Sequence, residues 1–166
     1  MVALDAGAAG LYVAGRTDGT LPGQTSSGGI DAFATVLSSQ VNPNTPPVNT
    51  VPQVTLTVNK NTSLAVTGIS VADPDAGTAP LQLTLTVGHG TLLVKTEASG
   101  GLKAGDIAGN GTGTVVLTGS QAQINATLAA AGGLIYTPST DFVGTDTLTV
   151  LTSDLGNTGS GGALTD

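Results

Sequence analysis

Residues 81–87 read LQLTLTV, and this stretch decides the fold class. Leucine or valine alternates with a polar residue, which is the two-residue period of a strand with one buried face. QVTLTVN at 53–59 repeats the alternation, and TLLVKT at 91–96 follows the turn residues GHG at 88–90. We therefore expect strands at all three places, with 81–87 and 91–96 forming a hairpin.

Three more strands are expected downstream, at residues 114–119, 133–138 and 146–153. The first of them follows GNGTG (109–113), which contains the Asn-Gly turn signal. Turn signals at this spacing are typical of a Greek-key β-sandwich. The sequence thus predicts an all-β protein.

One short helix is expected to cross over between two of these strands. Ser120 can cap its N-terminus, and Gln123 three residues later completes a capping box. Ile124 and Leu128 share one face of this helix, and Gly132 can adopt the left-handed conformation that follows a helix end.

The composition restricts the partners of the chain. Four basic residues face 11 acidic ones, for a net charge of −7, so nucleic acid is not an expected partner. The absence of cysteine excludes a disulfide framework, a thiol nucleophile and a thiolate metal site. No apolar run approaches the roughly 20 residues that span a bilayer. No signal peptide is visible in the first residues.

Residues 39–50, SQVNPNTPPVNT, predict a linker between two parts of the chain. Three prolines and three asparagines favour an extended, polyproline-like chain over a strand ladder. The expected organisation is a short β segment at 1–38, the linker at 39–50 and a sandwich at 51–166.

The segment before the linker contains the strand candidates LYVAG (11–15) and IDAFATVL (30–37), with a turn-rich stretch between them. Together, residues 5–37 resemble one β-propeller repeat of the bacterial SBBP type. The resemblance implies that residues 1–38 form a partial propeller blade. One blade cannot close a ring, because its faces pack on neighbouring blades.

The rest of the chain resembles a bacterial cadherin-like repeat, a domain found in tandem in very large RTX-type adhesins. The motifs that carry the resemblance are VNTVP (48–52), GISVADPDAG (68–77), LTLTVGHGTLLV (83–94) and the helix with its flanks (117–162). The resemblance implies a cadherin- or immunoglobulin-like sandwich that acts as a spacer or adhesive module. It also implies a closing strand after GGALTD, so we expect the sequence to stop before the last strand.

The same resemblance implies calcium, an extracellular or cell-surface location, and two kinds of partner. These are neighbouring repeats of the same chain and a cell-surface or matrix ligand. The mechanism that it suggests is mechanical, because a cation at the junction would fix the angle between neighbouring repeats.

Asp73 and Asp75 are the first candidates for calcium ligands. They stand two positions apart at the expected end of a strand, and Ca²⁺ prefers roughly 6–8 oxygen ligands. The alternative is an ordinary turn in which the aspartates accept local backbone amides. Lys60 and Asn61 stand where the family usually has an acidic pair, which argues for a weakened site. We expect a Kd on the order of 10⁻⁴–10⁻³ M.

Turns and the ends of the expected sandwich offer further oxygen ligands. Capping of a turn competes with metal ligation for three aspartates: Asp141, Asp146 and Asp154. Asp166 and the linker residues Asn42 or Asn44 would contribute from the domain ends, where the resemblance implies inter-repeat sites.

No catalytic constellation is visible, so we expect no enzymatic activity. His89 is the only histidine and Glu97 the only glutamate, and neither has a partner for nucleophilic or glycosidase chemistry. The main hypothesis is a calcium-stiffened structural or adhesive module. The alternative is a glycan- or protein-binding sandwich, which would need Tyr136 or Phe142 exposed on a concave surface.

Overall fold

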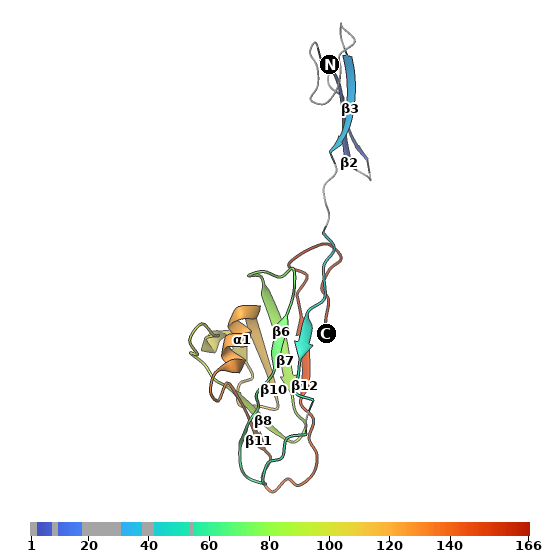
Figure 1. Ribbon diagram of the computed structural model, residues 1–166. Helices are drawn as coiled ribbons and strands as arrows, with labels where there is room; N and C mark the ends of the chain where they lie inside the picture. The colour runs from blue at the N-terminus through green and yellow to red at the C-terminus, as the bar shows by residue number, and fades with distance from the viewer. Residues whose placement is uncertain (1–2, 8–9, 18–30, 38–41, 54) are drawn as a thin grey trace. The chain divides into compact units, whose positions relative to one another are not determined.

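The computed structural model of the chain describes residues 3–7, 10–17, 31–37, 42–53 and 55–166 (Figure 1). The chain divides into two compact units, residues 1–41 and 42–166. Within the described residues, strands in antiparallel sheets dominate, and one α-helix occurs. The expectation of an all-β protein with one helix is confirmed at this level.

The first unit contains a three-stranded antiparallel sheet. Its strands are β1 (Ala3–Gly7), β2 (Gly10–Thr17) and β3 (Asp31–Leu37), with β2 in the middle. The strands expected at 11–15 and 30–37 are therefore present. Residues 18–30, which carry Pro22 and Gly23 of the propeller resemblance, lie outside the described residues.

The second unit contains two larger sheets and one strand pair. The four-stranded sheet has the order β12-β7-β10-β9, and its strands are Thr149–Ser153, Pro80–Thr86, Thr114–Ser120 and Ile107–Ala108. The three-stranded sheet has the order β5-β11-β8, and its strands are Leu64–Ala65, Leu134–Pro138 and Gly90–Val94. β4 (Val48–Thr50) pairs with β6 (Ser70–Ala72). A 3₁₀ turn, η1 (Ala104–Asp106), precedes β9.

The core of the second unit joins the apolar faces of both larger sheets. Leu81, Leu83 and Leu85 of β7 are fully buried, as the alternation of LQLTLTV predicts. Leu92 of β8 and Leu134 of β11 belong to the same buried cluster. This aliphatic core replaces the aromatic packing that the composition does not supply.

The hairpin expected between 81–87 and 91–96 is wrong. β7 pairs with β10 and β12, whereas β8 pairs with β11 in the other sheet. Both strands bury apolar side chains in the same core cluster, although they belong to different sheets. The chain therefore changes sheets at Gly88 and His89 instead of folding back within one sheet.

The strand expected at 53–59 is also wrong for the described residues. Residues 51–53 and 55–59 form no strand, and the pairing of β4 with β6 ends at Thr50. Alternating side chains make a strand only where a neighbour pairs with its backbone. The expected strand 146–153 is shortened in the same way, because β12 begins at Thr149.

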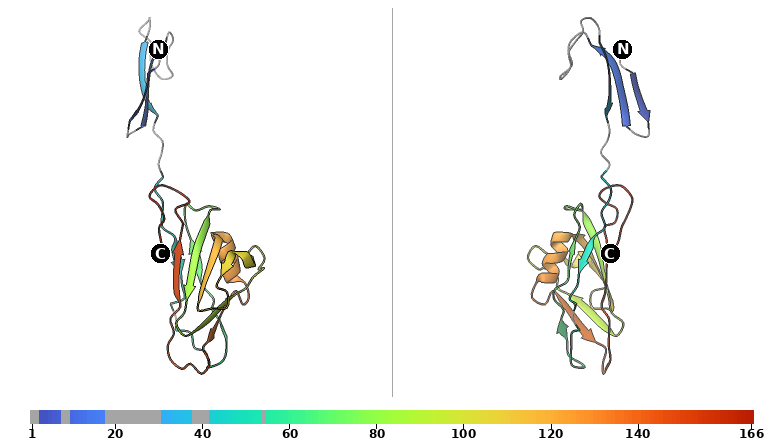
Figure 2. Two further views of the ribbon diagram at one scale, coloured as in Figure 1. Left: turned by 180° about the vertical axis from the view of Figure 1, so that it is seen from behind. Right: turned by 45° about the vertical axis from the view of Figure 1, so that its right-hand side comes forward.

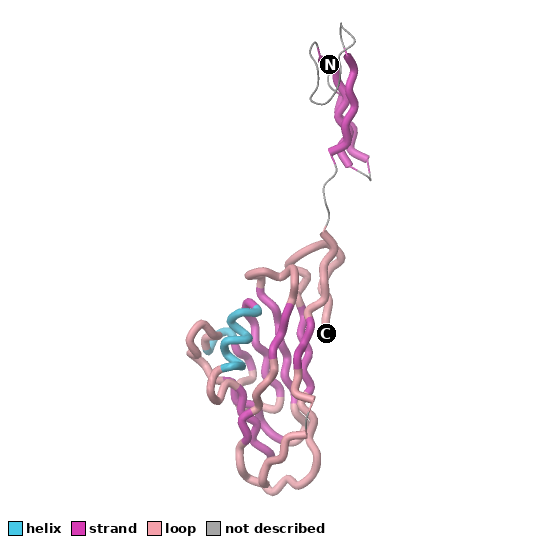
Figure 3. Tube along the Cα trace, in the orientation of Figure 1, coloured by secondary structure: helices cyan, strands magenta, loops and turns pink. Residues whose placement is uncertain are grey.

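The helix follows the expectation closely. α1 (Gln121–Ala129) begins after Ser120, whose side chain accepts a hydrogen bond from the backbone N–H of Gln123. Ile124 and Leu128 are buried. Figures 2 and 3 show the helix at one side of the strands. The side chain of Asn125 in this helix accepts from the N–H and donates to the C=O of Val71 in β6. The helix is thereby fixed to the strand that leads to Asp73.

A membrane-spanning helix would have to be much longer than α1. Among the described residues, no helix has the length and apolar character needed to cross a bilayer.

Candidate metal centre

The turn after β6 buries Asp73 and half-buries Asp75, the two aspartates that the sequence singled out. The side chain of Asp73 is only 2% exposed, and its Oδ1 accepts hydrogen bonds from the backbone N–H groups of Asp75 (3.2 Å) and Ala76 (3.1 Å). Gln121 at the start of α1 accepts from the Asp73 N–H at 2.9 Å. One carboxylate oxygen of Asp73 thus makes the ordinary contacts of a turn. None of these contacts involves its second oxygen, Oδ2.

That second oxygen has no donor. With both carboxyl groups ionised, Asp73 Oδ2 and Asp75 Oδ1 are buried without a hydrogen-bond donor among the described residues, whereas a proton on Asp73 lets it bond to Asp75. Burial, and then the neighbouring Asp75 carboxyl group, raise the pKa of Asp73 above its ordinary value. The protein therefore holds two adjacent carboxyl groups at a place where their negative charge is costly.

Asn44 adds a third oxygen of the same kind. Its side-chain Nδ2 donates to Asp154 Oδ2 at 2.6 Å and to the carbonyl oxygen of Gly162 at 2.8 Å. Because both partners are acceptors, the NH₂ end of the amide faces them and the oxygen faces away. Asn44 Oδ1 is buried there without a donor among the described residues.

Asn44 also stands next in the chain to a residue that contacts the aspartate pair. The backbone N–H of Thr45 donates to Asp75 Oδ2 at 3.2 Å. We call Asn44, Asp73 and Asp75 the junction cluster, because the bond from Thr45, the residue after Asn44, joins the start of the second unit to the turn after β6.

Asp154 supports this cluster from the loop after β12. Its side chain is 1% exposed, and its Oδ1 accepts from the backbone N–H groups of Leu164 (2.8 Å) and Gly156 (2.9 Å). Burial opposes the ionisation of Asp154, but these N–H groups and the Asn44 amide outweigh it and lower the pKa. Asp154 is therefore ionised at neutral pH and holds the Asn44 amide in a fixed orientation.

The junction cluster fits a hard cation in the chemistry of its donors. Three buried oxygens lack a donor, and Ca²⁺ is bound in proteins by carboxylate and amide oxygens of this kind. The described residues contain no group of three or more carboxylate, imidazole or thiol side chains placed to hold a metal ion. A cation here would thus depend on two carboxylates and the Asn44 amide, with further ligands from elsewhere.

Asp146, another expected ligand, lies among hydrogen-bond donors that belong to other segments. It accepts from the backbone N–H groups of His89 (2.8 Å) and Gly88 (2.9 Å), and from the Tyr136 hydroxyl (2.9 Å). Burial opposes its ionisation, but these donors and Thr147 lower the pKa of Asp146. The carboxylate anchors the sheet-to-sheet connection at Gly88 and His89.

The remaining candidates have protein partners as well. Asp141 forms an ion pair with Lys60 at 3.0 Å and accepts a hydrogen bond from Asn61 at 3.1 Å. Lys60 and Asn61 therefore have a structural role here, binding the Asp141 carboxylate, that needs no metal ion. The carboxylate of Asp166 accepts from the backbone N–H of Asn49.

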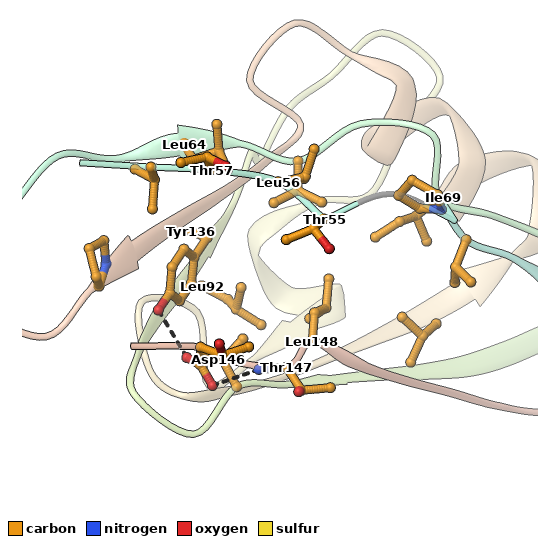
Figure 4. Close-up of a pocket in the computed structure, with 18 of the residues that line it drawn as sticks. Thr55, Leu56, Thr57, Leu64, Ile69, Leu92, Tyr136, Asp146, Thr147 and Leu148 are labelled. Carbon is orange, nitrogen blue, oxygen red and sulfur yellow. Dashed lines mark hydrogen bonds between the residues drawn. The ribbon is translucent and has the colours of Figure 1, made fainter. Parts of the chain in front are cut away.

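The ligand-binding alternative depends on how exposed the rings of Tyr136 and Phe142 are. Both line a pocket of about 940 Å³ in the second unit (Figure 4). The Tyr136 hydroxyl is engaged by Asp146 and by the carbonyl oxygen of His89, and the ring of Phe142 stacks on the ring of His89 at 4.5 Å between centroids. The rings are half-buried in this arrangement, so neither forms a fully open platform.

Sequence reasoning missed two contributors to the junction cluster. The sequence assigns no role to Gln121 and places Thr45 only within the linker, yet both residues hold the aspartate turn. No local pattern points to either contact, because each depends on segments that meet only in the folded chain.

Comparisons with protein-family models, with curated proteins and with solved structures found no match for this chain.

Proposed function

We propose that the chain is a non-enzymatic structural module of a larger extracellular or surface protein, and that Ca²⁺ at the junction cluster stiffens it. The observation that supports this proposal is the set of three buried oxygens without donors on Asn44, Asp73 and Asp75. A buried acceptor without a partner costs about 1–3 kcal/mol. A cation that accepts all three oxygens as ligands offsets this cost and the repulsion within the aspartate pair.

Each residue has a distinct part in this proposal. Asp73 and Asp75 supply negative charge from the turn after β6, and Asn44 supplies a neutral oxygen from the start of the second unit. Asp154 orients Asn44 through its 2.6 Å hydrogen bond. When bound, the cation supplies electrostatic attraction that holds residues 42–45 against the body of the unit.

The proposed location follows from the strength expected of such a site. Few carboxylates and an incomplete set of protein oxygens favour weak binding, with a Kd on the order of 10⁻⁴–10⁻³ M, as in extracellular calcium modules. A site of this strength fills only where Ca²⁺ reaches millimolar concentration. The neighbouring repeats of the same chain and a surface or matrix ligand remain the partners that this proposal suggests.

Calorimetric titration of CaCl₂ into the chelator-treated 166-residue chain tests the proposal. We expect a Kd in the range given above, and a melting temperature about 3–6 °C higher at a tenfold excess over Kd than in EDTA. The double variant Asp73→Asn/Asp75→Asn should lose both responses. Asp141→Asn changes charge beside Lys60 and should keep them.

The melting temperature in EDTA distinguishes loss of the site from loss of the fold. Without calcium, the double variant should melt at or above the wild-type temperature, because the repulsion between the two carboxylates is gone. Equal melting of the wild type in calcium and in EDTA, with no heat of binding, would remove calcium from the proposal.

A glycan- or protein-binding role is the second candidate, and one observation favours it. The rings of Tyr136 and Phe142 both line the 940 Å³ pocket. Titration of soluble oligosaccharides, followed by the fluorescence of Tyr136 in a Tyr12→Phe background, tests this role. Saturable quenching would support it, and an unchanged signal would leave the pocket to another occupant.

A further inference from the structure

The edge of β8 that faces away from β11 is covered by a short segment, residues 110–112. The backbone N–H of Leu92 donates to the carbonyl oxygen of Thr112 (2.8 Å), and the Leu92 carbonyl oxygen accepts from the Gly111 N–H (2.8 Å). Peptide groups two residues apart on a strand point to the same side, so those of Val94 need partners on this edge as well. We call residues 110–112 the edge strap.

The side chain of Asn110 supplies the partners of Val94. Its Oδ1 accepts from the Val94 N–H at 2.7 Å, and its Nδ2 donates to the Val94 carbonyl oxygen at 2.9 Å. The amide thus makes the same two bonds that a paired residue of a neighbouring strand would make. An amide suits this role because it carries a donor and an acceptor side by side, whereas a carboxylate carries acceptors alone.

Asn110 is also the one asparagine of the sequence that a glycine follows. A glycine at this position favours intramolecular deamidation, because its peptide nitrogen, once deprotonated, reaches the amide carbon without obstruction from a side chain. The Gly111 nitrogen attacks Cγ of Asn110, ammonia leaves, and a five-membered succinimide forms. Water then opens the succinimide to aspartate or isoaspartate. The reaction as a whole consumes one water and releases one ammonia, and it needs no other reactant.

The folded chain keeps both reacting groups from this reaction. The Gly111 N–H donates to the Leu92 carbonyl oxygen, which stabilises the proton that the nitrogen must lose. The Asn110 amide is half-buried and is fixed by its two bonds to Val94. Succinimide formation therefore requires the edge strap to leave β8 first, in a local opening of the structure.

From these contacts, we propose that Asn110 is a deamidation site controlled by the edge strap, and that its modification permanently releases the edge of β8. Deamidation replaces the Nδ2 donor with a second carboxylate oxygen, which would face the carbonyl oxygen of Val94. Isoaspartate also adds a methylene group to the main chain of the edge strap and shifts it along β8. Either product leaves the Val94 carbonyl oxygen without its donor and uncovers a strand edge. This inference does not depend on calcium at the junction cluster.

Asn125 provides a matched comparison within the same chain. Its side chain makes the same pair of bonds, since it accepts from the Val71 N–H at 2.9 Å and donates to the Val71 carbonyl oxygen at 2.7 Å. The residue that follows is Ala126, whose side chain hinders the approach of its nitrogen to the amide carbon. The two asparagines thus share their contacts and differ in the next residue, so we expect faster deamidation at Asn110.

Peptide mapping by mass spectrometry tests the site and its control by the fold. The 166-residue chain is kept at mildly alkaline pH, in buffer and in a denaturing concentration of guanidinium chloride, and the deamidated fractions of Asn110 and Asn125 are followed over time. In denaturant, Asn110 should deamidate much faster than Asn125. In buffer, Asn110 should deamidate at least about tenfold more slowly than in denaturant, because the edge strap must first open.

The variant Asn110→Asp imitates one product and tests the release of the edge. It should lower the melting temperature by about 5 °C, and hydrogen exchange at the Val94 N–H, followed by NMR, should become at least about tenfold faster. The Lys95 N–H, which donates to Gly133, serves as the internal control for exchange. Asn59→Asp makes the same charge change at an exposed residue and should shift the melting temperature by less than about 2 °C.

The deamidated wild-type chain gives the same two measurements on the product itself. It is separated from the unmodified chain by ion exchange, because each event adds one negative charge. This measurement also serves if Asn110→Asp does not accumulate as a folded protein, since deamidation then takes place after folding.

Three results would overturn the proposal. Equal rates at Asn110 and Asn125 in denaturant would mean that Asn110 is no preferred site. Equal rates at Asn110 in buffer and in denaturant would mean that the edge strap does not control it. A deamidated chain with the melting temperature and the Val94 exchange of the unmodified chain would mean that the edge is not released.

Discussion

Asn44 donates its side-chain amide to the carboxylate of Asp154 at 2.6 Å, although 110 residues separate the two in the sequence. The bond connects the first residues of the second unit to the loop after β12. It is reinforced by the backbone, since the Asn44 N–H donates to the carbonyl oxygen of Ser160 at 2.9 Å. The chain that enters the second unit is therefore part of its hydrogen-bonded structure.

Asn44→Ala should destabilise the second unit by about 1.5–3 kcal/mol, because it removes a hydrogen bond to a buried charged group. Chemical unfolding in urea, followed by circular dichroism, measures this change. Asn42→Ala is the matched control: Asn42 is exposed, its backbone carbonyl oxygen remains bonded to Ser160, and the variant should unfold like the wild type. Equal effects of the two substitutions would contradict the role given to Asn44.

Stability should fall in acid as Asp154 and Asp146 take up protons. Their pKa values are lowered by folding, so their contribution is fully present above the ordinary value of 3.8 and is lost as the pH falls through the folded values. The melting temperature should therefore drop as the pH falls below the ordinary value of 3.8. Asp154→Asn should melt lower than the wild type at pH 7 and show a shallower fall in acid.

Protonation of Asp73 should change the stability in the opposite direction, raising it as the pH falls. Its pKa is raised, so the folded state takes up a proton at Asp73 before the unfolded state does, and stability rises as the pH falls toward 3.8. In EDTA, the melting temperature of Asp73→Asn should lack this rise. A wild-type melting temperature that does not rise as the pH falls toward 3.8 would contradict the account of Asp73, whatever calcium does.

Tyr136 should ionise at a higher pH than a free tyrosine. Burial, and then the Asp146 carboxylate, raise the pKa of Tyr136 to about 12. The stability that the neutral hydroxyl contributes is present below pH 10 and is lost as the pH rises from 10 toward 12. Ultraviolet titration of a Tyr12→Phe chain isolates Tyr136, and adding Asp146→Asn should move its transition to lower pH.

Two glycine substitutions should differ sharply. A methyl group at Gly133 would lie 2.7 Å from the carbonyl oxygen of Leu128 and closer still to that of Thr127, and backbone atoms cannot easily move away. Gly133→Ala should therefore cost more than about 2 kcal/mol. Gly105→Ala meets nothing within 4 Å and should be neutral or stabilising by up to about 1 kcal/mol. Thermal melts of both variants make the comparison.

Local patterns predicted the elements of the second unit better than their partners. The alternation in LQLTLTV identified β7, and Ser120 with Gln123 identified the start of α1, because these signals arise from a residue and its close neighbours. The pairing of β7 with β10 and β12 depends on how two apolar faces meet in one core. A turn such as GHG is compatible with either a hairpin or a change of sheet.

For the candidate site, too, the sequence shows the residues but not the contacts that the fold gives them. Asp73 and Asp75 are visible as a carboxylate pair in the sequence, but the burial of Asp73 and the missing donors arise only in the folded chain. Asn44 was one of several possible contributors from the linker, and its selection depends on Asp154 and Gly162. Lys60 was read as a lost ligand, and its ion pair with Asp141 gives it a separate structural reason.

The pairing at the start of the second unit also determines how the unit meets mechanical force. Pro43 and Ser160 form a parallel bridge, and the N–H of Ser160 donates to Asn42 while its carbonyl oxygen accepts from Asn44. Tension that draws residue 42 and residue 166 in opposite directions along these parallel segments loads the hydrogen bonds in shear. They must then break together and not one after another. The segment that joins the second unit to what precedes it is in this way also its mechanical clamp.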